Sequence, residues 1–367
     1  MPANSKKVFV AVTNDISSDQ RVHKVCEYLT KKGFEVEVYG RVLSDTFEVE
    51  RSYKITRKKL WFNNNFLFYA EYNVKLLFYL FFRKYKYILS NDLDTLPACF
   101  IASKLKKTEL IYDSHEYFTE VPELQGRKFV QKFWLKIEGF FLPKVKNAIT
   151  VSQPIADAYK KKYKVNFEIL RNLPSLDREV HYEEVSFPTN NKVVLYQGIL
   201  NPGRGIKPMI DALNFLENID LVIIGYGKVK NELIEYVKKI GLTDRVHFLG
   251  RIPHEKLPNY TKIADVGMVM EEPLGKSFEY SLPNKLFDFI HEGIPIISSP
   301  LVEVKKIVEK YNVGLVIKNY EPTHIAEIIR TLVSDKELRK TIILNQKSVK
   351  KHLSWENDVK LLDKFFI

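Results

Sequence analysis

The same order of strand, loop, helix and strand occurs twice in this chain, and this repetition limits the fold more than any other feature. Residues 6–13 (KKVFVAVT) are an apolar run rich in β-branched residues, and a polar loop, an amphipathic helix over 21–32 and the strand FEVEVYG follow. Residues 192–197 (KVVLYQ) open the second series, with a helix over 206–216 and a strand over 221–224. This βαβ order predicts an α/β fold whose parallel sheets carry helices on both faces.

Short apolar runs at regular intervals extend both series. The further predicted strands are 87–89, 109–112, 148–151 and 167–170 in the first series, and 246–249, 266–270, 294–298 and 314–317 in the second. Helical or loop sequence separates each run from the next, as parallel strands require.

The length of the chain, 367 residues, fits two such domains. A polar, proline-marked stretch (DREVHYEEVSFPTNN) is typical of a linker between them. We therefore predict an N-terminal Rossmann-like domain over 1–175, a linker over 176–190, a second Rossmann-like domain over 191–350, and a C-terminal helix over 351–367 that returns to the first domain. Because ligands bind at the carboxyl ends of parallel strands, we expect the active site in a central cleft between two facing domains.

Cysteine content and charge exclude several classes of protein. Cys26 and Cys99 lack a second Cys or a His at ligand spacing, which excludes a zinc module, a redox CxxC and a disulfide framework. The 57 basic and 45 acidic residues give a net charge of +12, which favours anionic partners. No nucleic-acid-binding module is recognisable, so nucleic acid is not an expected partner.

Neither a signal peptide nor a membrane-spanning helix is predicted. The first apolar run is too short for the core of a signal peptide. The most apolar stretch, 66–82, is interrupted by Glu71, Asn73 and Lys75, whereas a spanning helix needs about 20 nearly uninterrupted apolar residues. We therefore expect a cytoplasmic protein.

The aromatic and basic region 57–87 has two interpretations. Its basic residues Arg57, Lys58, Lys59, Arg83, Lys84 and Lys86 bracket an aromatic run, a pattern that suits binding at the inner, anionic face of a membrane. The alternative is a helix packed on the first sheet together with a basic surface loop.

The most informative stretch is 279–298 (EYSLPNKLFDFIHEGIPIIS). Ser281 is a candidate N-cap with Pro283 in the first turn, so a helix is predicted to begin here with its free N–H groups directed at an anion. Lys285 and Asp288 lie three residues apart on one face, where the carboxylate can accept both hydroxyls of a ribose. The alternative is a plain i,i+3 ion pair worth about 0.2–0.5 kcal/mol.

The stretch LPNKLFDFIHEGIPII resembles the donor-site signature of glycosyltransferase family 4, whose members are retaining enzymes with the GT-B fold of two facing Rossmann-like domains. Further similar stretches follow the family's order: YDSHEYF, NAITVSQPIADAYKKKY, YQGILNPGRGI and LVIIGYGKVKNEL. The resemblance implies transfer of a sugar from a nucleotide-sugar donor to a hydroxyl of a saccharide or lipid-linked acceptor, with retention. It implies no cofactor and no metal.

The resemblance also assigns residues on the donor side. Arg204 corresponds to the family's phosphate-binding arginine, and its planar fork suits phosphate. The usual lysine position is Met209, so Lys207 or Lys285 is expected to substitute. Asp288 corresponds to the second acid of the E-x7-E motif, but Tyr280 stands at the position of the first. The full predicted donor site is Gly198, Arg204, Lys207, Gly225, Arg251, Ser281, Leu282, Pro283 and Asp288, and the predicted catalytic residues are Arg204, His115 and Lys285.

On the acceptor side, Asp113, His115 and Glu116 follow the strand 109–112 and are expected at its carboxyl end. The loop 14–21 replaces the Gly-Gly turn of the family, so Asn14, Asp15 and Arg21 are expected to bind through their side chains. Two alternatives stay open: His115 as a structural residue beside a strand end, and helix capping by Asp19 or Ser18 as the role of the loop.

Two other functions fit the same fold. A nucleotide-sugar 2-epimerase needs acids that flank the sugar, for which Glu116 and Glu120 are candidates. A non-catalytic nucleotide-sugar-binding or scaffold protein is favoured by Tyr280 at the position of the first acid.

Overall fold

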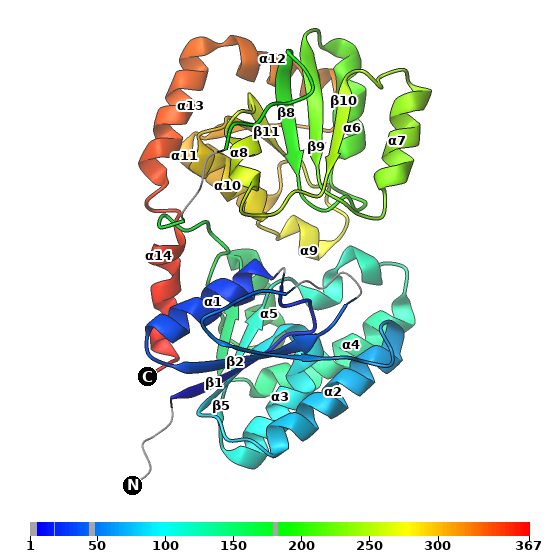
Figure 1. The fold of residues 1–367 in the computed structure, drawn as a ribbon. Helices are drawn as coiled ribbons and strands as arrows, with labels where there is room; N and C mark the ends of the chain where they lie inside the picture. The colour runs from blue at the N-terminus through cyan, green and yellow to red at the C-terminus, as the bar shows by residue number, and fades with distance from the viewer. Residues whose placement is uncertain (1–5, 18, 44–47, 179–182) are drawn as a thin grey trace. The chain divides into compact units, whose positions relative to one another are not determined.

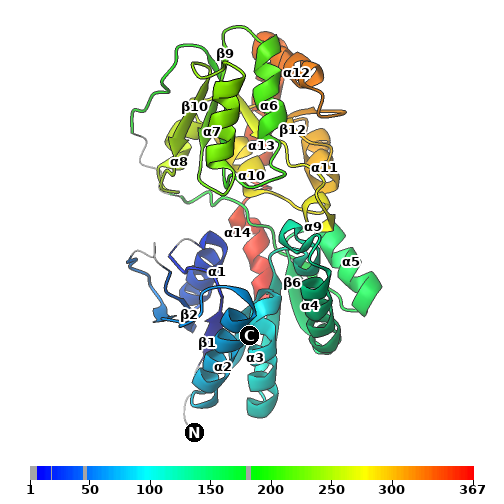
Figure 2. The same ribbon diagram turned by 90° about the vertical axis from the view of Figure 1, so that its right-hand side faces the viewer.

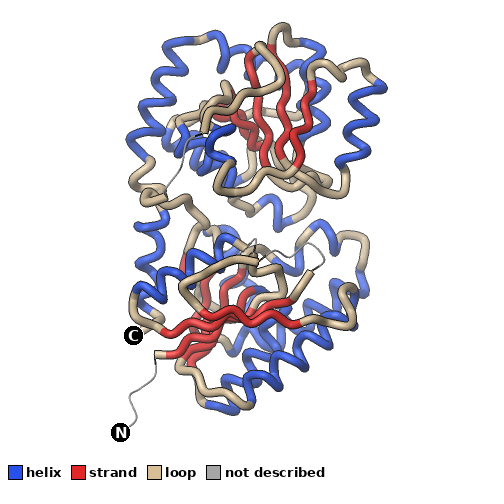
Figure 3. The backbone as a smooth tube through the Cα atoms, in the orientation of Figure 1, coloured by secondary structure: helices blue, strands red, loops and turns tan. Residues whose placement is uncertain are grey.

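The computed structural model describes residues 6–17, 19–43, 48–178 and 183–367 (Figure 1). The chain divides into two compact units. Unit 1 comprises Met1–Asn172 together with Val359–Ile367, and unit 2 comprises Leu173–Asp358. In each unit the strands lie together as one sheet with helices on its faces, as predicted (Figure 3).

Within its described residues, unit 1 has seven parallel strands in the order β3-β2-β1-β4-β5-β6-β7. The central strand β1 pairs on both sides, so Val8 lies opposite Val36 and Tyr87. The strands are β1 Lys7–Ala11, β2 Glu35–Arg41, β3 Lys54–Lys58, β4 Tyr87–Asn91, β5 Glu109–Ser114, β6 Asn147–Thr150 and β7 Glu168–Ile169. The apolar runs of β1 and β4 are buried on both faces, as in parallel sheets generally.

The helices of unit 1 are α1 Gln20–Lys31, α2 Asn65–Phe81, α3 Asp92–Lys106, α4 Lys128–Phe141 and α5 Gln153–Tyr163, with 3₁₀ turns η1 Phe118–Glu120, η2 Pro122–Leu124, η3 Leu142–Lys144 and η5 Val359–Lys364. Asp19 is the N-cap of α1, because its side chain accepts a hydrogen bond from the Val22 N–H; this confirms the capping alternative. Ser18 lies outside the described residues. Helices α2, α3 and α4 form one layer, side by side in Figure 2.

The strand β3 was not predicted. Its sequence KITRK is basic and only partly buried, and it pairs with β2 at the edge of the sheet. Edge strands often carry charge, which hides them from a pattern based on burial. Region 57–87 is therefore mainly the end of an edge strand, a loop and the long helix α2; the packing of that helix on the sheet is confirmed, and membrane binding stays a prediction.

Unit 2 has a parallel sheet in the order β10-β9-β8-β11-β12-β13. Its strands are β8 Lys192–Gln197, β9 Ile219–Ile224, β10 Val246–Gly250, β11 Val266–Val269, β12 Ile296–Ser298 and β13 Gly314–Val316. Its helices are α6 Ile206–Ala212, η4 Leu213–Phe215, α7 Lys230–Lys239, α8 Leu257–Thr261, α9 Lys276–Glu279, α10 Asn284–Glu292, α11 Val302–Tyr311, α12 Pro322–Ser334, α13 Lys336–Val349 and α14 Trp355–Asp358.

Alternation along the central strand β8 divides the core of unit 2 into two layers. Val194 and Tyr196 point to the layer that contains α6, α7 and α12. Val193 and Leu195 point to the layer that contains α10 and α11. A run that is apolar throughout therefore supplies both faces of the sheet.

The boundary between the units lies at Asn172/Leu173, earlier than the predicted 175/176. Pro174 and Ser175 belong to unit 2 because they are tied to α14: the Pro174 carbonyl accepts the Trp355 N–H, and the Ser175 hydroxyl donates to Glu356. The chain returns to unit 1 at Val359, not at 351. Part of the predicted linker, 179–182, lies outside the described residues.

The helix α10 begins later than the sequence predicted. Pro283 occupies the N-cap position and Asn284 is the first helical residue. Ser281 does not cap this helix, because its hydroxyl donates to the Phe278 carbonyl at 2.8 Å and so closes the end of α9. The proline fixes an extended backbone just before α10, which a search for a hydroxyl cap does not detect.

Candidate active site

The loops that follow β8, β9 and β10 meet through their backbones at the carboxyl edge of the unit 2 sheet. Gly225 donates its N–H to the Gly250 carbonyl at 2.8 Å. A Cβ on Gly225 would lie 1.8 Å from the Gly198 carbonyl oxygen, so no other residue fits there. Gly198 leaves open the space beside Lys285, since a Cβ on it would lie 3.9 Å from Nζ. Gly198 and Gly225, both predicted donor-site residues, thus lie together.

A buried charge cluster lies at the same edge. Glu271 follows β11, its side chain is fully buried, and its carboxylate lies 2.7 Å from Lys285 Nζ and 3.5 Å from Arg204 Nη1. Burial on its own raises the pKa of Glu271, but the charges of Lys285 and Arg204 outweigh it and hold that pKa below its usual value. We call these three side chains the Glu271 cluster.

The Glu271 cluster has more positive than negative charge. Two cations share one carboxylate, which leaves an excess of one positive charge. Burial lowers the pKa of Lys285, with Glu271 opposing and Arg204 adding to the shift. Arg204 Nε is buried without a hydrogen-bond partner. A donor that is shielded from water and lacks a partner is costly unless an acceptor completes it, so the cluster has the properties of an anion site.

Lys285 and Asp288 both lie on α10 but have different partners. Lys285 pairs with Glu271, so the alternative of an i,i+3 ion pair between Lys285 and Asp288 is wrong. Asp288 accepts a hydrogen bond from Gln197 Nε2 at 3.2 Å, and Gln197 in turn accepts from the Thr261 hydroxyl at 2.8 Å. Gln197, the buried last residue of β8, therefore orients Asp288.

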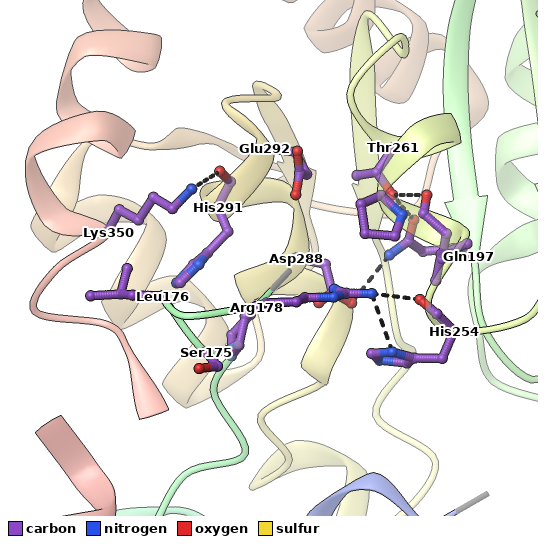
Figure 4. Close-up of a pocket in the computed structure, with 13 residues that line it drawn as sticks. Ser175, Leu176, Arg178, Gln197, His254, Thr261, Asp288, His291, Glu292 and Lys350 are labelled. Carbon is purple, nitrogen blue, oxygen red and sulfur yellow. Dashed lines mark hydrogen bonds between the residues drawn. The ribbon is translucent and has the colours of Figure 1, made fainter. Parts of the chain in front are cut away.

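Asp288 opens onto a polar pocket of about 160 Å³ (Figure 4). His254 and Arg178 line the same pocket, and Arg178 donates to the His254 carbonyl at 2.5 Å. The full lining is Pro174, Ser175, Leu176, Arg178, Gln197, His254, Leu257, Pro258, Thr261, Asp288, His291, Glu292 and Lys350. Carboxylate, amide, hydroxyl and imidazole groups therefore converge on a space where a polyhydroxylated group could be held.

Other predicted donor residues lie outside the Glu271 cluster. Lys207 is exposed and stacks over the Tyr236 ring at 4.4 Å, so of the two candidate lysines the structure brings only Lys285 to Arg204. Met209 is fully buried in the core. Arg251 lies over the Tyr226 ring at 4.9 Å, in the turn after β9. Leu282 packs on the core beside α10.

In unit 1, the predicted acceptor residue Arg21 is buried in an ion pair. Its Nε and Nη2 donate to the two carboxylate oxygens of Asp113 at 3.0 and 2.7 Å, and its Nη1 donates to the Leu170 carbonyl at 2.7 Å. Burial raises the pKa of Asp113, but Arg21 and His115 outweigh it and lower that pKa strongly. Because all three guanidinium nitrogens donate hydrogen bonds to protein acceptors, Arg21 links α1 to β5.

His115 lies between two carboxylates at the end of β5. Its Nδ1 is 3.4 Å from Asp92, and its Nε2 is 3.4 Å from Asp113 and 3.1 Å from Asn91 Oδ1. Burial lowers the pKa of His115, but Asp92 and Asp113 outweigh it and raise that pKa to about 9. At neutral pH the imidazole of His115 is therefore protonated and lies between the carboxylates of Asp92 and Asp113. This supports the alternative that His115 has a structural role.

The remaining residues of the predicted acceptor side are more open or locally bonded. Asn14 is exposed and lies 3.5 Å from Asp19, while Asp15 accepts from the Ser17 N–H and hydroxyl. Glu116 is exposed, and its carbonyl accepts from Ser114. In the described part of the chain, no group of three His, Cys, Asp or Glu is arranged to hold a metal ion, and no helix is long and apolar enough to cross a membrane.

Two family models match this chain in succession. The model for glycosyltransferase family 4 matches residues 19–174, and that for glycosyl transferases group 1 matches residues 177–349. The chain belongs to glycosyltransferase family 4. The relationship suggested by LPNKLFDFIHEGIPII is thus confirmed for both halves of this glycosyltransferase.

Curated relatives of the glycosyltransferase are distant. An uncharacterized glycosyltransferase of Methanocaldococcus jannaschii is 26% identical over 289 residues, which cover 73% of this chain and 70% of the relative. A Campylobacter jejuni α-1,4-N-acetyl-D-galactosaminyltransferase, named for a saccharide on PP-undecaprenol, is 26% identical over 262 residues, or 70% of this chain and 67% of the relative.

Solved structures confirm the GT-B fold of the glycosyltransferase. Sucrose-phosphate synthase from Thermosynechococcus elongatus has a TM-score of 0.80 at 17% identity, with 98% of each chain covered. Anabaena HepE in complex with UDP-glucose has a TM-score of 0.75 at 16% identity, again with 98% of each chain covered.

The sequence reasoning missed two residues of this site. Glu271 follows the apolar run 266–270 directly, and an acid at the end of a buried parallel strand is a usable signal. Gln197 ends the strand KVVLYQ in the same way. Both side chains act at the carboxyl edge of the sheet, where one supports the cations and the other orients Asp288.

Proposed function

We propose that this glycosyltransferase transfers a sugar from a nucleoside-diphosphate sugar to a hydroxyl of a saccharide acceptor, with retention at the anomeric carbon. The Glu271 cluster carries this proposal, because its excess positive charge and unused Arg204 donor suit a diphosphate. HepE, a structural neighbour, is described in complex with UDP-glucose, which supports a nucleotide sugar as the donor.

The proposed chemistry is stabilisation of the leaving group. The bond between the anomeric carbon and the phosphate oxygen breaks, and negative charge grows on the diphosphate. Arg204, Lys285 and the first N–H groups of α10 neutralise this charge, so we propose that no metal is required. The acceptor oxygen bonds to the anomeric carbon on the face that the diphosphate leaves, and its proton passes to a phosphate oxygen.

Glu271 acts in this scheme through its neighbours. Its carboxylate lies 2.7 Å from Lys285 Nζ and so keeps the buried amine charged. Loss of the carboxylate would leave the buried Lys285 amine beside the Arg204 guanidinium without a counterion, and Lys285 would release its proton at a lower pH. Glu271 is thus a positioning residue for the two cations.

Asp288 is proposed to bind the ribose. The Gln197 amide fixes one carboxylate oxygen, and the polar pocket beside it accommodates a group that presents several hydroxyls. A carboxylate that accepts two hydroxyl hydrogen bonds contributes about 1.5–3 kcal/mol, since bonds to charged groups are the strong ones.

We also propose that the acceptor saccharide is carried on a lipid and that the enzyme works in the cytoplasm at the inner face of the membrane. The Campylobacter relative supports this, because its name specifies a saccharide on PP-undecaprenol as the acceptor. The aromatic surface of unit 1 described below supports it independently.

Release of nucleoside diphosphate tests the function. The enzyme is incubated with a panel of nucleotide sugars, with and without extracted lipid-linked saccharides. Acceptor-dependent release of diphosphate, abolished in Arg204→Ala and retained in Lys207→Ala, supports transfer. Conversion of the donor to another nucleotide sugar without acceptor would indicate an epimerase, and tight donor binding with no turnover on any acceptor would indicate a scaffold.

A further inference from the structure

The outer surface of the helical layer α2, α3 and α4 is unusually apolar. More than half of the large hydrophobic side chains exposed in the described part of the chain fall between Trp61 and Phe140. In Figure 2 the three helices lie side by side on one face of unit 1. A contiguous apolar surface of this kind marks an interaction site in soluble proteins.

One stripe of α2 supplies the centre of this surface. Leu67, Val74, Phe78 and Phe81 are between 51% and 68% exposed, and their spacing of seven, four and three residues places them on one side of the helix. The opposite side, which includes Tyr72, is buried in the core. Helix propensity does not require an apolar outer side, so the stripe indicates a partner.

Helix α4 continues the surface with alternating aromatic and basic side chains. Phe129, Phe133 and Phe140 are exposed, while Trp134 on the opposite side is buried. The Phe133 ring lies 5.5 Å from that of Phe66 on α2, which joins the two helices into one surface. The lysines on the outer side of α4 are Lys128, Lys132 and Lys136, and Lys144 follows the helix.

The surface is basic and its acids are occupied. Glu71 is the only acidic residue in 57–87, and its carboxylate accepts the N–H groups of Trp61 and Phe62 and pairs with Lys75. In α4 the only acid is Glu138, which is buried. Exposed basic residues around the stripe include Lys58, Lys59, Arg83, Lys84, Lys104 and Lys107.

We propose that this surface, formed by the α2 stripe, the outer side of α4 and the exposed Ile101 and Leu105 of α3, docks unit 1 on an anionic lipid bilayer. The aromatic side chains enter the interface between headgroups and acyl chains, and the lysines contact lipid phosphates. The basic side chains around the aromatic groups add attraction to an anionic surface.

The charge pattern favours lipid over a second copy of this chain. Two copies joined through this surface would bring the lysines of both α4 helices together with no exposed carboxylate from α2 or α4 to pair with them. An anionic bilayer matches both the apolar and the basic parts of the surface.

The structure thereby changes the sequence-based expectation for 57–87. Two of its six bracketing cations are not freely exposed: two guanidinium nitrogens of Arg57 are buried, and Lys86 Nζ donates to the Ile367 carbonyl at 2.5 Å. Helix α4, which lies outside 57–87, supplies the lysines that replace them.

Trp61 provides an intrinsic probe. It is 84% exposed, whereas Trp134 and Trp355 are 5% and 6% exposed. The full-length protein is titrated with vesicles of phosphatidylcholine alone and of equal parts phosphatidylcholine and phosphatidylglycerol, without donor or acceptor. We expect a blue shift of tryptophan emission and co-sedimentation with the anionic vesicles. Binding at low salt weakens at high salt without vanishing, because the apolar contact is not screened.

Paired variants locate the contact. Val74→Ser/Phe78→Ser should lower the partition coefficient about tenfold or more, since these exposed side chains lose apolar contact. Lys132→Glu/Lys136→Glu should lower it about tenfold or more and remove the preference for anionic vesicles. The controls Phe215→Ser and Lys336→Glu/Lys340→Glu, which change exposed residues of unit 2 at matched spacing, should bind as the unchanged protein does.

Light scattering and circular dichroism complete the experiment. All variants should be monomeric and folded, because the changed side chains are exposed. The proposal is overturned if the unchanged protein does not bind anionic vesicles at low salt, or if neither pair of substitutions weakens binding. It is also overturned if the unchanged protein is a dimer that Val74→Ser/Phe78→Ser converts to monomers.

Discussion

The two units each place a buried charge cluster at the carboxyl edge of a parallel sheet, and the clusters differ in balance. In unit 1, Arg21 and His115 are matched by Asp113 and Asp92 at hydrogen-bonding or ion-pair distance. In unit 2, Arg204 and Lys285 share the single carboxylate of Glu271. The charges of the first cluster are balanced by protein side chains, whereas the second cluster carries one positive charge without a counterion.

This difference separates structural from ligand-binding charge. A buried cation whose N–H donors all bind protein acceptors stabilises its neighbours, but it has no donor left to bind a substrate. A buried cation pair with one counterion is stabilised further when an anion arrives. The carboxyl edge of the sheet therefore carries a structural ion-pair cluster in unit 1 and a candidate diphosphate site in unit 2.

The largest expected effect is on the stability of unit 1. Asp113→Ala leaves Arg21 without its carboxylate and should lower the free energy of unfolding by about 3–5 kcal/mol. Urea unfolding followed by circular dichroism measures this change. The control Asp363→Ala removes a half-exposed partner of Lys32 and should cost less than about 1 kcal/mol. Equal losses in both variants would mean that the Arg21 pair is no more than a surface contact.

The next effect is on catalysis in unit 2. Arg204→Ala should reduce kcat by about 100-fold to 1,000-fold, because the charge that Arg204 meets grows as the sugar–phosphate bond breaks. Its effect on the stability of unit 1 should be negligible. Steady-state kinetics decide the point: a rise in the donor KM with kcat unchanged would make Arg204 a uniform binder of the donor.

A smaller effect is expected at the ribose. Asp288→Ala should weaken binding of a nucleoside diphosphate by about 1.5–3 kcal/mol, since charge-assisted hydrogen bonds to two hydroxyls are lost. Titration calorimetry measures the dissociation constant. The constant of Asp288→Asn, which retains the shape of the side chain, should lie between those of the unchanged protein and Asp288→Ala. An unchanged constant in folded Asp288→Ala would remove this residue from the site.

The smallest effect concerns pH. Because the fold raises the pKa of His115 to about 9, the stabilisation that it provides is complete below about pH 6.5 and is lost as pH rises through 9. Burial also raises the pKa of Asp94 to about 7, of Glu116 to about 8 and of Cys99 to about 12, so these groups add to the fall of stability with pH and the part due to His115 is isolated by its variant.

The free energy of unfolding should therefore fall between pH 7 and pH 10 in the unchanged protein, and His115 should account for on the order of 1–2 kcal/mol of that fall. His115→Asn should lack this part of the slope, and His352→Asn, a change at an exposed histidine, should retain it. An equal slope in His115→Asn and in the unchanged protein would assign the titration to other groups.

Much of the fold was predictable from the sequence because parallel strands are buried on both faces. The runs KKVFVAVT and KVVLYQ became β1 and β8 for this reason. The edge strand β3 escaped prediction because Lys54 and Lys58 are exposed and its other residues are only partly buried. Helix α10 begins two residues later than predicted, with Pro283 in place of Ser281 as the N-cap, because the Ser281 hydroxyl donates to the Phe278 carbonyl instead.

The candidate site was predictable where residues identified by a sequence motif also lie together in the structure. Arg204 and Lys285 were named from the sequence and lie together in the structure. Arg21 was assigned to the acceptor, but its partner Asp113 lies 92 residues further along the chain, so sequence spacing could not reveal the ion pair. Glu271 was missed although its place just after a buried strand was a usable signal; its two cationic partners are revealed only by the fold.

Binding of diphosphate to the Glu271 cluster is the most direct test of this account. Titration calorimetry compares a nucleoside diphosphate with the unphosphorylated nucleoside, on the unchanged protein and on Lys285→Met. The account predicts that Lys285→Met weakens binding of the diphosphate about tenfold or more and leaves binding of the nucleoside unchanged, because Lys285 meets only the phosphates. Equal affinity of the folded Lys285→Met protein for the diphosphate would contradict the assignment of this cluster as the anion site.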